Sequence, residues 1–209
     1  MTGGRMGRWP VLGVALVLTA RPSARLTAQA SISASLGARY TSTLVHDSIV
    51  APFDVRASIA PAFAATVGLP LNAPWQLELE LDLSTGVVQR HDVDGSTAPI
   101  THLTTLGVTV GLGRQLRPWL VGRVAVGGLK YLPSESVGLF RDGSGGVIPY
   151  GRAGVDIAPP IATRHHVALQ VTGDVHRLLT PALRNDGFVE SRVVYRLSVG
   201  VRADLWRRS

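Results

Sequence analysis

Histidine, aspartate and serine gather at two places in the chain, and together these residue types can carry acyl transfer. His46-Asp47-Ser48 are consecutive, and His91-Asp92 is followed closely by Ser96. A histidine that takes the proton from a serine hydroxyl turns that hydroxyl into a nucleophile. No spacing here matches a nucleophile motif, and these residue types are ordinary in polar loops. We therefore interpret both places as loops and expect no catalytic residue.

The other candidate ligands for a metal or a cofactor are isolated from one another. His165-His166 is a neighbouring pair, and neighbours in a strand point to opposite faces, so the two rings do not chelate together. The chain has no cysteine, which excludes a thiolate metal site, a catalytic thiol and a redox motif. Gly143-Ser144-Gly145-Gly146 opens no helix, so a loop tip is favoured over a phosphate-binding loop. We expect neither a metal nor a cofactor.

Apolar and polar residues alternate through most of residues 31–209. Between Trp75 and Leu83, five apolar residues alternate with Gln76, Glu78, Glu80 and Asp82. Because side chains of a strand point alternately to opposite faces, this pattern predicts strands with one apolar and one polar face. The same pattern recurs in eight segments, which we predict as strands over residues 31–44, 55–69, 75–88, 100–113, 119–132, 147–158, 165–178 and 191–206.

The predicted connections alternate between short and long. The short ones are turn-like and rich in proline or asparagine, at residues 71–74, 114–118 and 159–164. The long ones are polar, at residues 45–54, 89–99, 133–146 and 179–190. Short turns on one side and long loops on the other are typical of an outer-membrane barrel with its turns in the periplasm. The fold class that we expect is all-β, an eight-stranded antiparallel up-and-down transmembrane β-barrel.

Residues 1–30 have the pattern of a cleavable signal peptide. Arg5 and Arg8 form a positively charged region before a 12-residue apolar stretch, Trp9 to Ala20. Ala28-Gln29-Ala30 then supplies a small-x-small cleavage pattern. The stretch is shorter than the roughly 20 residues with which a helix crosses a bilayer. We expect a signal peptide over residues 1–30 and the barrel over residues 31–209. The alternative is an uncleaved anchor or a basic tail.

The charge of the chain is concentrated in that leader. The whole chain has 21 basic and 14 acidic residues, for a net charge of +7, and four arginines lie in residues 1–30, which leaves +3 for the rest. The remaining charge is scattered, whereas nucleic-acid binding needs a basic stripe on one face. We expect no nucleic-acid partner.

Alternation alone does not say which face meets lipid, because a soluble lipocalin-like barrel has the same period with its apolar side inward. The polar face carries small residues that suit a narrow bore, such as Gly37, Gly107 and Gly200. It also carries arginines and acids of mixed sign, while Lys130 is the only lysine of the chain. We therefore place the apolar face outward. The residues expected to meet lipid are Leu79, Val108, Val171 and Val199, and those expected in the bore are Glu80, Thr109, Thr172 and Arg202.

The aromatic residues fit the two interfaces of a membrane by their height. Trp75, Trp119 and Trp206 fall at the turn end, and Tyr40, Tyr131 and Tyr195 towards the loop end. By parity, however, Trp206 is expected to face the bore. Pro61 also departs from the pattern, because proline removes a hydrogen bond from a strand ladder.

Charged residues on the polar face allow two hypotheses, a selective pore or a closed interior in which each charge is paired. Eight strands enclose a bore that side chains just fill, whereas aqueous channels need about 16 strands, so the closed interior is favoured. The charges expected inside are Arg39, Arg56, Glu78, Glu80, Asp82, Arg123, Arg152, Asp156, Asp174, Arg192, Arg196, Arg202 and Asp204.

The leader, the eight alternating segments and the rhythm of short turns and long loops resemble the small outer-membrane barrels of the OmpA and OmpX kind. The resemblance covers residues 31–209 and is one of architecture. It implies the outer membrane as location, insertion by the barrel-assembly machinery, and contact with outer-membrane lipids and lipopolysaccharide. Such barrels often end on an aromatic residue, whereas Trp206 lies three residues before the end of this sequence, so that feature is either displaced or absent.

We expect an integral outer-membrane protein with a structural or surface-interaction role, in which the long loops bind any surface ligand. Small barrels that transfer or remove acyl chains on lipid A carry histidine and serine near the loop rim. A lipid-A-modifying acyltransferase or deacylase is therefore one alternative. A small pore and a soluble periplasmic lipocalin-like binding barrel are the others.

Overall fold

The structure is a computed structural model that describes residues 30–47, 53–159, 167–187 and 191–207. Apart from two short helical segments, the elements within these ranges are all β-strands. No helix among the described residues is both long and apolar enough to cross a membrane. The expected signal peptide lies outside the described residues except for its last position, and it stays a prediction.

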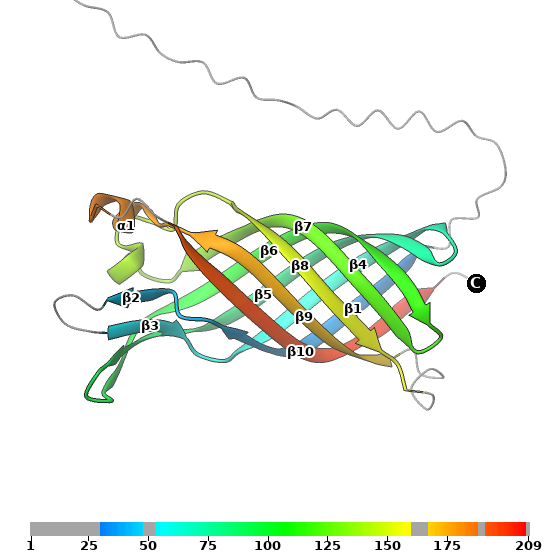
Figure 1. Ribbon diagram of the computed structural model, residues 1–209, viewed down its shortest axis with the longest axis horizontal. Coiled ribbons are helices and arrows are strands. Elements are labelled where there is room, and N and C mark those ends of the chain that lie inside the picture. Colours follow the sequence, from blue (N-terminus) through cyan, green and yellow to red (C-terminus); the bar gives the residue numbers. More distant parts are fainter. Residues whose placement is uncertain (1–29, 48–52, 160–166, 188–190, 208–209) are drawn as a thin grey trace, which may run out of the picture.

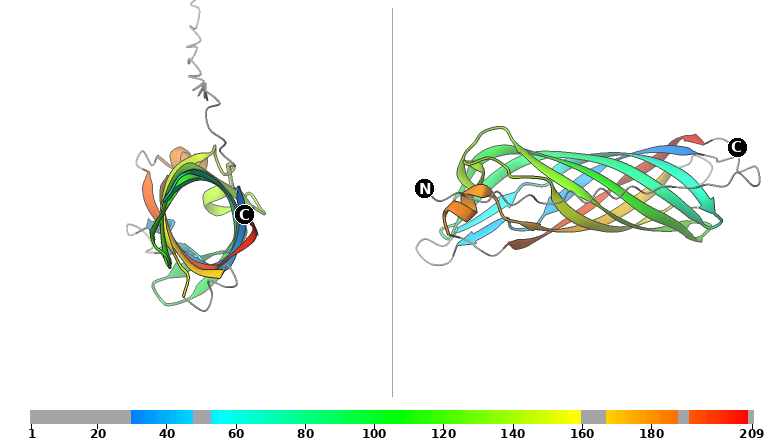
Figure 2. Two further views of the ribbon diagram at one scale, coloured as in Figure 1. Left: turned by 90° about the vertical axis from the view of Figure 1, so that its right-hand side faces the viewer. Right: turned by 90° about the horizontal axis from the view of Figure 1, so that it is seen from above.

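Eight long strands form a closed ring, as the alternation predicted (Figure 1). Neighbours in the ring are antiparallel, and the pairing of the first strand with the last completes the circle that Figure 2 shows end-on. The ring consists of β1 (Ser31–Thr41), β4 (Ala60–Asn72), β5 (Trp75–Asp92), β6 (Thr97–Arg117), β7 (Leu120–Pro133), β8 (Ile148–Ile157), β9 (Val167–Leu178) and β10 (Arg192–Arg207). The chain is an eight-stranded antiparallel up-and-down barrel.

Two further strands, which the sequence did not predict, extend the barrel at its loop end. β2 (Val45–Asp47) pairs with β3 (Phe53–Ala57), and β3 pairs with the end of β5. The single strand predicted over residues 55–69 is therefore wrong: it breaks at Ser58 and Ile59, between β3 and β4. The break also reverses the facing, because the inward side holds Val55 in β3 but Ala60 in β4.

The connection predicted over residues 89–99 is also shorter than expected. β5 continues to Asp92 and β6 begins at Thr97, so four residues suffice to reverse the chain. Gly95 in this turn has a φ of 84°, a conformation that glycine adopts without a steric penalty. The other described loops carry the short helices η1 (Gly138–Phe140) and α1 (Pro181–Asn185), and Thr180 caps α1 by accepting a hydrogen bond from the Leu183 amide.

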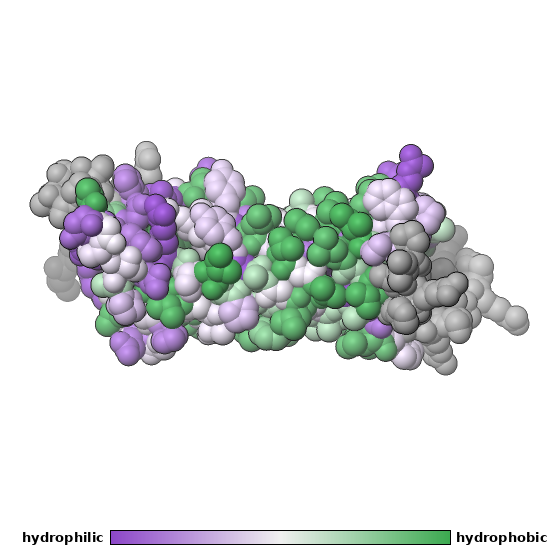
Figure 3. Space-filling model, turned by 90° about the horizontal axis from the view of Figure 1, so that it is seen from below, coloured by the Kyte–Doolittle hydropathy of each residue, from purple (hydrophilic) through white to green (hydrophobic). Residues whose placement is uncertain are grey.

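The outer surface of the ring is an apolar belt (Figure 3). The side chains of Leu79, Val108 and Val199 are 45 to 55% exposed on it, and Val171 on the same face is partly covered. The residues predicted to face the bore, Glu80, Thr109, Thr172 and Arg202, are all buried. A closed sheet with an apolar exterior and a charged interior is stable in lipid rather than in water. The protein is a transmembrane barrel of the outer membrane, and the lipocalin-like facing is excluded.

The facing expected for Trp206 is wrong, because β10 contains a bulge. Ile32 pairs with Trp206 whereas Ser33 pairs with Asp204, so Leu205 is an extra residue that has no partner. An extra residue shifts the parity of the residues after it. Trp206 therefore lies on the outer face, 46% exposed, next to Ile32.

Candidate functional site

Charged side chains that pair across the bore fill the centre of the barrel. Arg152 on β8 contacts Glu80 and Asp82 on β5 and Asp174 on β9. Its Nη2 atom lies 2.9 Å from Asp82 Oδ1, and its Nε atom lies 2.6 Å from Asp174 Oδ1. One guanidinium thus joins strands on opposite sides of the ring.

Arginines on β1 and β10 complete this central layer. Arg39 Nη1 lies 2.6 Å from Asp82 Oδ2, and Arg196 Nη2 lies 2.6 Å from Asp174 Oδ2. Arg39 also donates from Nε to Ser198 Oγ at 2.8 Å. These side chains are at most 5% exposed, and a buried charge is costly unless it is paired. The pairs therefore allow this layer to remain closed.

A second charged layer lies nearer the turn end. Arg123 on β7 contacts both Glu78 and Asp156, with its Nη2 atom 2.6 Å from Asp156 Oδ2. Arg202 on β10 approaches the same two carboxylates at 3.9 and 3.6 Å. Thr66 connects the layers, since its hydroxyl donates to Glu80 and lies 3.5 Å from Arg202 Nη1.

Ten of the thirteen charges predicted for the interior take part in these two layers. They are five arginines and five acids, so the network is balanced: Arg39, Arg123, Arg152, Arg196 and Arg202 with Glu78, Glu80, Asp82, Asp156 and Asp174. Arg56 is exposed instead, because the break before β4 turns its side chain outward to Asp54. Arg192 is exposed where β10 begins at the loop rim, and Asp204 is only partly buried at the turn end.

Small residues on the inward face make room for this network. Gly107 on β6 lies beneath the Asp82 carboxylate and the Tyr150 hydroxyl, and a Cβ atom there would lie 2.6 Å from that hydroxyl. The Tyr150 hydroxyl donates to Asp82 Oδ1 at 2.9 Å. The expectation that glycines of the polar face line a narrow bore is therefore confirmed at this position.

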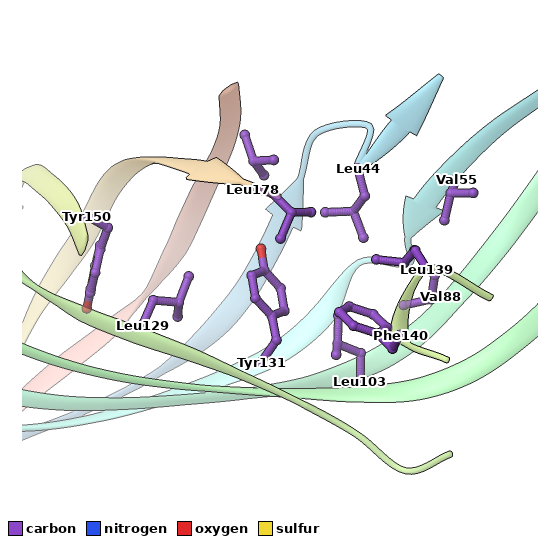
Figure 4. Close-up of a cluster of buried hydrophobic side chains, with 11 residues drawn as sticks. Leu44, Val55, Val88, Leu103, Leu129, Tyr131, Leu139, Phe140, Tyr150 and Leu178 are labelled. Carbon is purple, nitrogen blue, oxygen red and sulfur yellow. The ribbon is translucent and has the colours of Figure 1, made fainter. Parts of the chain in front are cut away.

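The loop end of the barrel is closed by an apolar core that the sequence did not predict (Figure 4). Phe140 of η1 is completely buried in it, with its ring centroid 5.9 Å from that of Tyr131 on β7. The core also contains Leu139 of η1 and Leu44 between β1 and β2. Its other members come from the strands, namely Val55, Val88, Leu103, Leu129, Tyr150, Leu178 and Val194. Apolar side chains, rather than charges, thus separate the network from the loop surface.

One expectation for β7 is corrected by this core. Leu129 is an apolar residue on the same inward face of β7 as Arg123, and it is fully buried. Tyr131, expected in the aromatic belt, is 1% exposed, and its hydroxyl lies 2.7 Å from Nε2 of His176. Tyr40 and Tyr195 do lie on the outer face, 51 and 61% exposed. The sequence thus predicted the position of Tyr131 along the barrel axis correctly, but its side chain faces the bore and not the lipid.

The histidines that suggested acyl transfer have other partners. His46 Nδ1 lies 2.7 Å from Asp54 Oδ1, and His91 Nδ1 lies 3.1 Å from Thr97 Oγ1. The hydrogen bond with His46, and then that from Arg56, lowers the pKa of Asp54, which lies beyond the membrane-spanning part. No serine hydroxyl of the described residues bonds to either ring.

Several candidate ligands fall outside the described ranges. Ser48, considered for acyl transfer, and His165-His166, considered for metal binding, are among them, so what was expected of these residues stays a prediction. Within the described ranges, no group of three histidine, aspartate or glutamate residues is arranged to hold a metal ion.

The turn end of the bore is hollow, in contrast to the loop end. A cavity of about 610 Å³ lies there, lined by the second charged layer through Arg123, Asp156 and Arg202 and by Trp75 and Trp119 at the rim. Farther in, the cavities beside the network measure only about 20 Å³, enough for about one water molecule. Among the described residues, the bore therefore narrows from this cavity at the turn end to a closed centre.

No protein-family model matches the chain, and no curated protein matches it. Solved structures with a similar fold include Ail, the attachment invasion locus protein of Yersinia pestis, at 12% identity and a TM-score of 0.48, covering 84% of this chain and 98% of Ail. OprG of Pseudomonas aeruginosa is 11% identical with a TM-score of 0.48, covering 85% of this chain and 96% of OprG. Neisserial surface protein A is 12% identical with a TM-score of 0.45, covering 84% and 97%. The description of this chain as a transmembrane barrel rests on its own strand order and apolar belt.

Proposed function

We propose that this protein is a closed outer-membrane barrel that acts through its loop-end surface, without conduction or catalysis. The observation that carries the proposal is the double closure of the bore, by the balanced charge network and by the apolar core. A pore needs a continuous polar path, and Phe140 and Leu129 are completely buried across that path. The interior therefore serves stability, and the loop end is the part available to a partner.

The loop end offers a projecting sheet with one polar face. His46, Asp54, His91 and Thr97 are directly opposite one another on β2, β3, β5 and β6, so their side chains share that face. The sheet projects from the loop end of the barrel (Figure 1). This face supports a surface-interaction role with a polar ligand. Lipopolysaccharide would surround the sheet, and the barrel-assembly machinery would insert the chain.

The alternative enzyme function has less support, because the two histidines bond to Asp54 and Thr97. An acyltransferase would place a serine hydroxyl against a histidine ring so that the ring can take its proton. Ser96 uses its backbone amide instead, donating to the Asp94 carboxylate at 2.8 Å.

Conductance and loop accessibility test the proposal. The purified full chain in planar bilayers should give no stable current, and steady open channels would revive the pore. In intact cells, a Val93→Cys variant should react with a membrane-impermeant maleimide, because Val93 is 77% exposed in the β5–β6 turn. The matched Gln115→Cys variant at the turn end should react only after lysis. Labelling in the opposite order would overturn the loop-end role.

A further inference from the structure

An apolar groove lies on the outer face of the barrel, towards the turn end. It encloses about 510 Å³ across β6, β7, β8 and β9. Leu112 and Val124 form one side, and Val155 and Val171 form the other. The groove reaches from the turn end to about the middle of the belt, where Ala153 pairs with Gly173. It therefore lies in the half of the membrane that faces the turns.

The packing of the barrel does not require a glycine at position 173, which forms the floor of this groove. Gly173 lies within β9, its φ is not positive, and a Cβ atom added to it would meet nothing within 4 Å. Glycine in a strand costs conformational entropy and contributes no contact. Gly107, by contrast, is needed because the Asp82 carboxylate fills the space above it. At Gly173 the absent side chain only makes the outer surface concave.

A cation stands at the turn-end limit of the groove. The Arg114 guanidinium lies over the Trp75 ring, with its carbon 5.0 Å from the ring centroid. Both residues line the groove, and among the described residues no carboxylate pairs with Arg114. Tryptophan at this height sits at the headgroup level of a membrane. The guanidinium is thus held at the interface with donors available to an anion.

We propose that the groove binds one glycerophospholipid of the periplasmic leaflet, with an acyl chain over Gly173 and the phosphate on Arg114. The inference rests on the membrane location of the barrel and is separate from the loop-end function. Guanidinium donors match the oxygens of a phosphodiester, and lipid is the solvent on this face. An apolar floor that leads to the Arg114 guanidinium has the chemistry of such a lipid. A second copy of the belt would bring no phosphate.

Native mass spectrometry of the full chain, released from vesicles of phosphatidylethanolamine and phosphatidylglycerol, tests this proposal. The wild type should retain one phospholipid. Gly173→Leu fills the floor of the groove and should lower lipid retention by excluding the acyl chain. Arg114→Gln removes the phosphate contact and should lower lipid retention about tenfold, the effect of one charge-assisted hydrogen bond. Ala38→Leu on the outer face of β1 and Arg177→Gln at the loop end are the matched controls, and both should retain the lipid.

The outcomes separate this proposal from the function of the barrel. Heat-modifiable gel mobility first shows that each variant is a folded barrel. A folded wild type without bound lipid, or retention in Gly173→Leu and Arg114→Gln equal to that of the wild type, would overturn the groove while the loop-end role stands. A dimer whose formation Gly173→Leu abolishes would assign the groove to a second copy and also overturn the proposal.

Discussion

The pairing of Arg152 with three carboxylates makes it the residue whose loss should damage the barrel most. Arg152→Met keeps a long side chain in the bore and removes the guanidinium from Glu80, Asp82 and Asp174. Asp82 keeps Arg39 and Asp174 keeps Arg196, but Glu80 keeps only the Thr66 hydroxyl. The network would then hold one uncompensated negative charge.

The expected cost follows from burial. Removing one partner from a buried pair destabilises a protein by roughly 3–5 kcal/mol, because the other charge is left without compensation. The side chains of Arg152 and Asp174 are 6 and 1% exposed, so the full range applies. Arg141 pairs with Asp186 at the loop surface with both side chains more than 40% exposed. Arg141→Met should therefore leave the free energy of unfolding nearly unchanged.

A second substitution distinguishes charge balance from simple loss of contacts. Glu80→Gln in the Arg152→Met background restores equal numbers of positive and negative charges, so the double variant should be more stable than Arg152→Met alone. Urea unfolding in lipid vesicles, followed by tryptophan fluorescence and gel mobility, gives the free energy of unfolding. If the double variant is the less stable of the two, the reasoning from charge balance is refuted.

Three further outcomes are expected. Phe140→Ala should lower the free energy of unfolding by about 3–5 kcal/mol in the same assay, because the ring is fully buried in the loop-end core. Lipid-borne quenchers should affect a label at Val171→Cys more than one at Thr172→Cys, since only Thr172 faces the bore. The hydrogen bond from His46 lowers the pKa of Asp54, so the stabilisation of the β2–β3 hairpin is present above the ordinary aspartate pKa of about 3.9 and is lost as the pH falls through the lowered value. Amide exchange of the hairpin should show this loss, and the Asp54→Asn variant should not.

The sequence by itself determined the fold class and most of the facing. Side chains of a strand alternate by covalent geometry, so an apolar residue at every second position already places Leu79 and Glu80 on opposite faces. The small residues and the arginines of the polar face then place Glu80 inward. The alternation of side chains within one strand does not depend on the neighbouring strands. It holds wherever the strand is regular, and it failed at Trp206 and Arg56, where a bulge and a break shift the parity.

Tertiary structure alone decided which charges pair and what closes the loop end. The carboxylates that meet Arg152 lie 22, 70 and 72 residues away in the chain, and they converge only when the ring closes with its particular stagger. Phe140 belongs to a loop without a strand pattern, and its burial depends on how η1 folds back over Tyr131. Such contacts depend on the positions of several strands at once, whereas the alternation that the sequence reveals belongs to each strand separately.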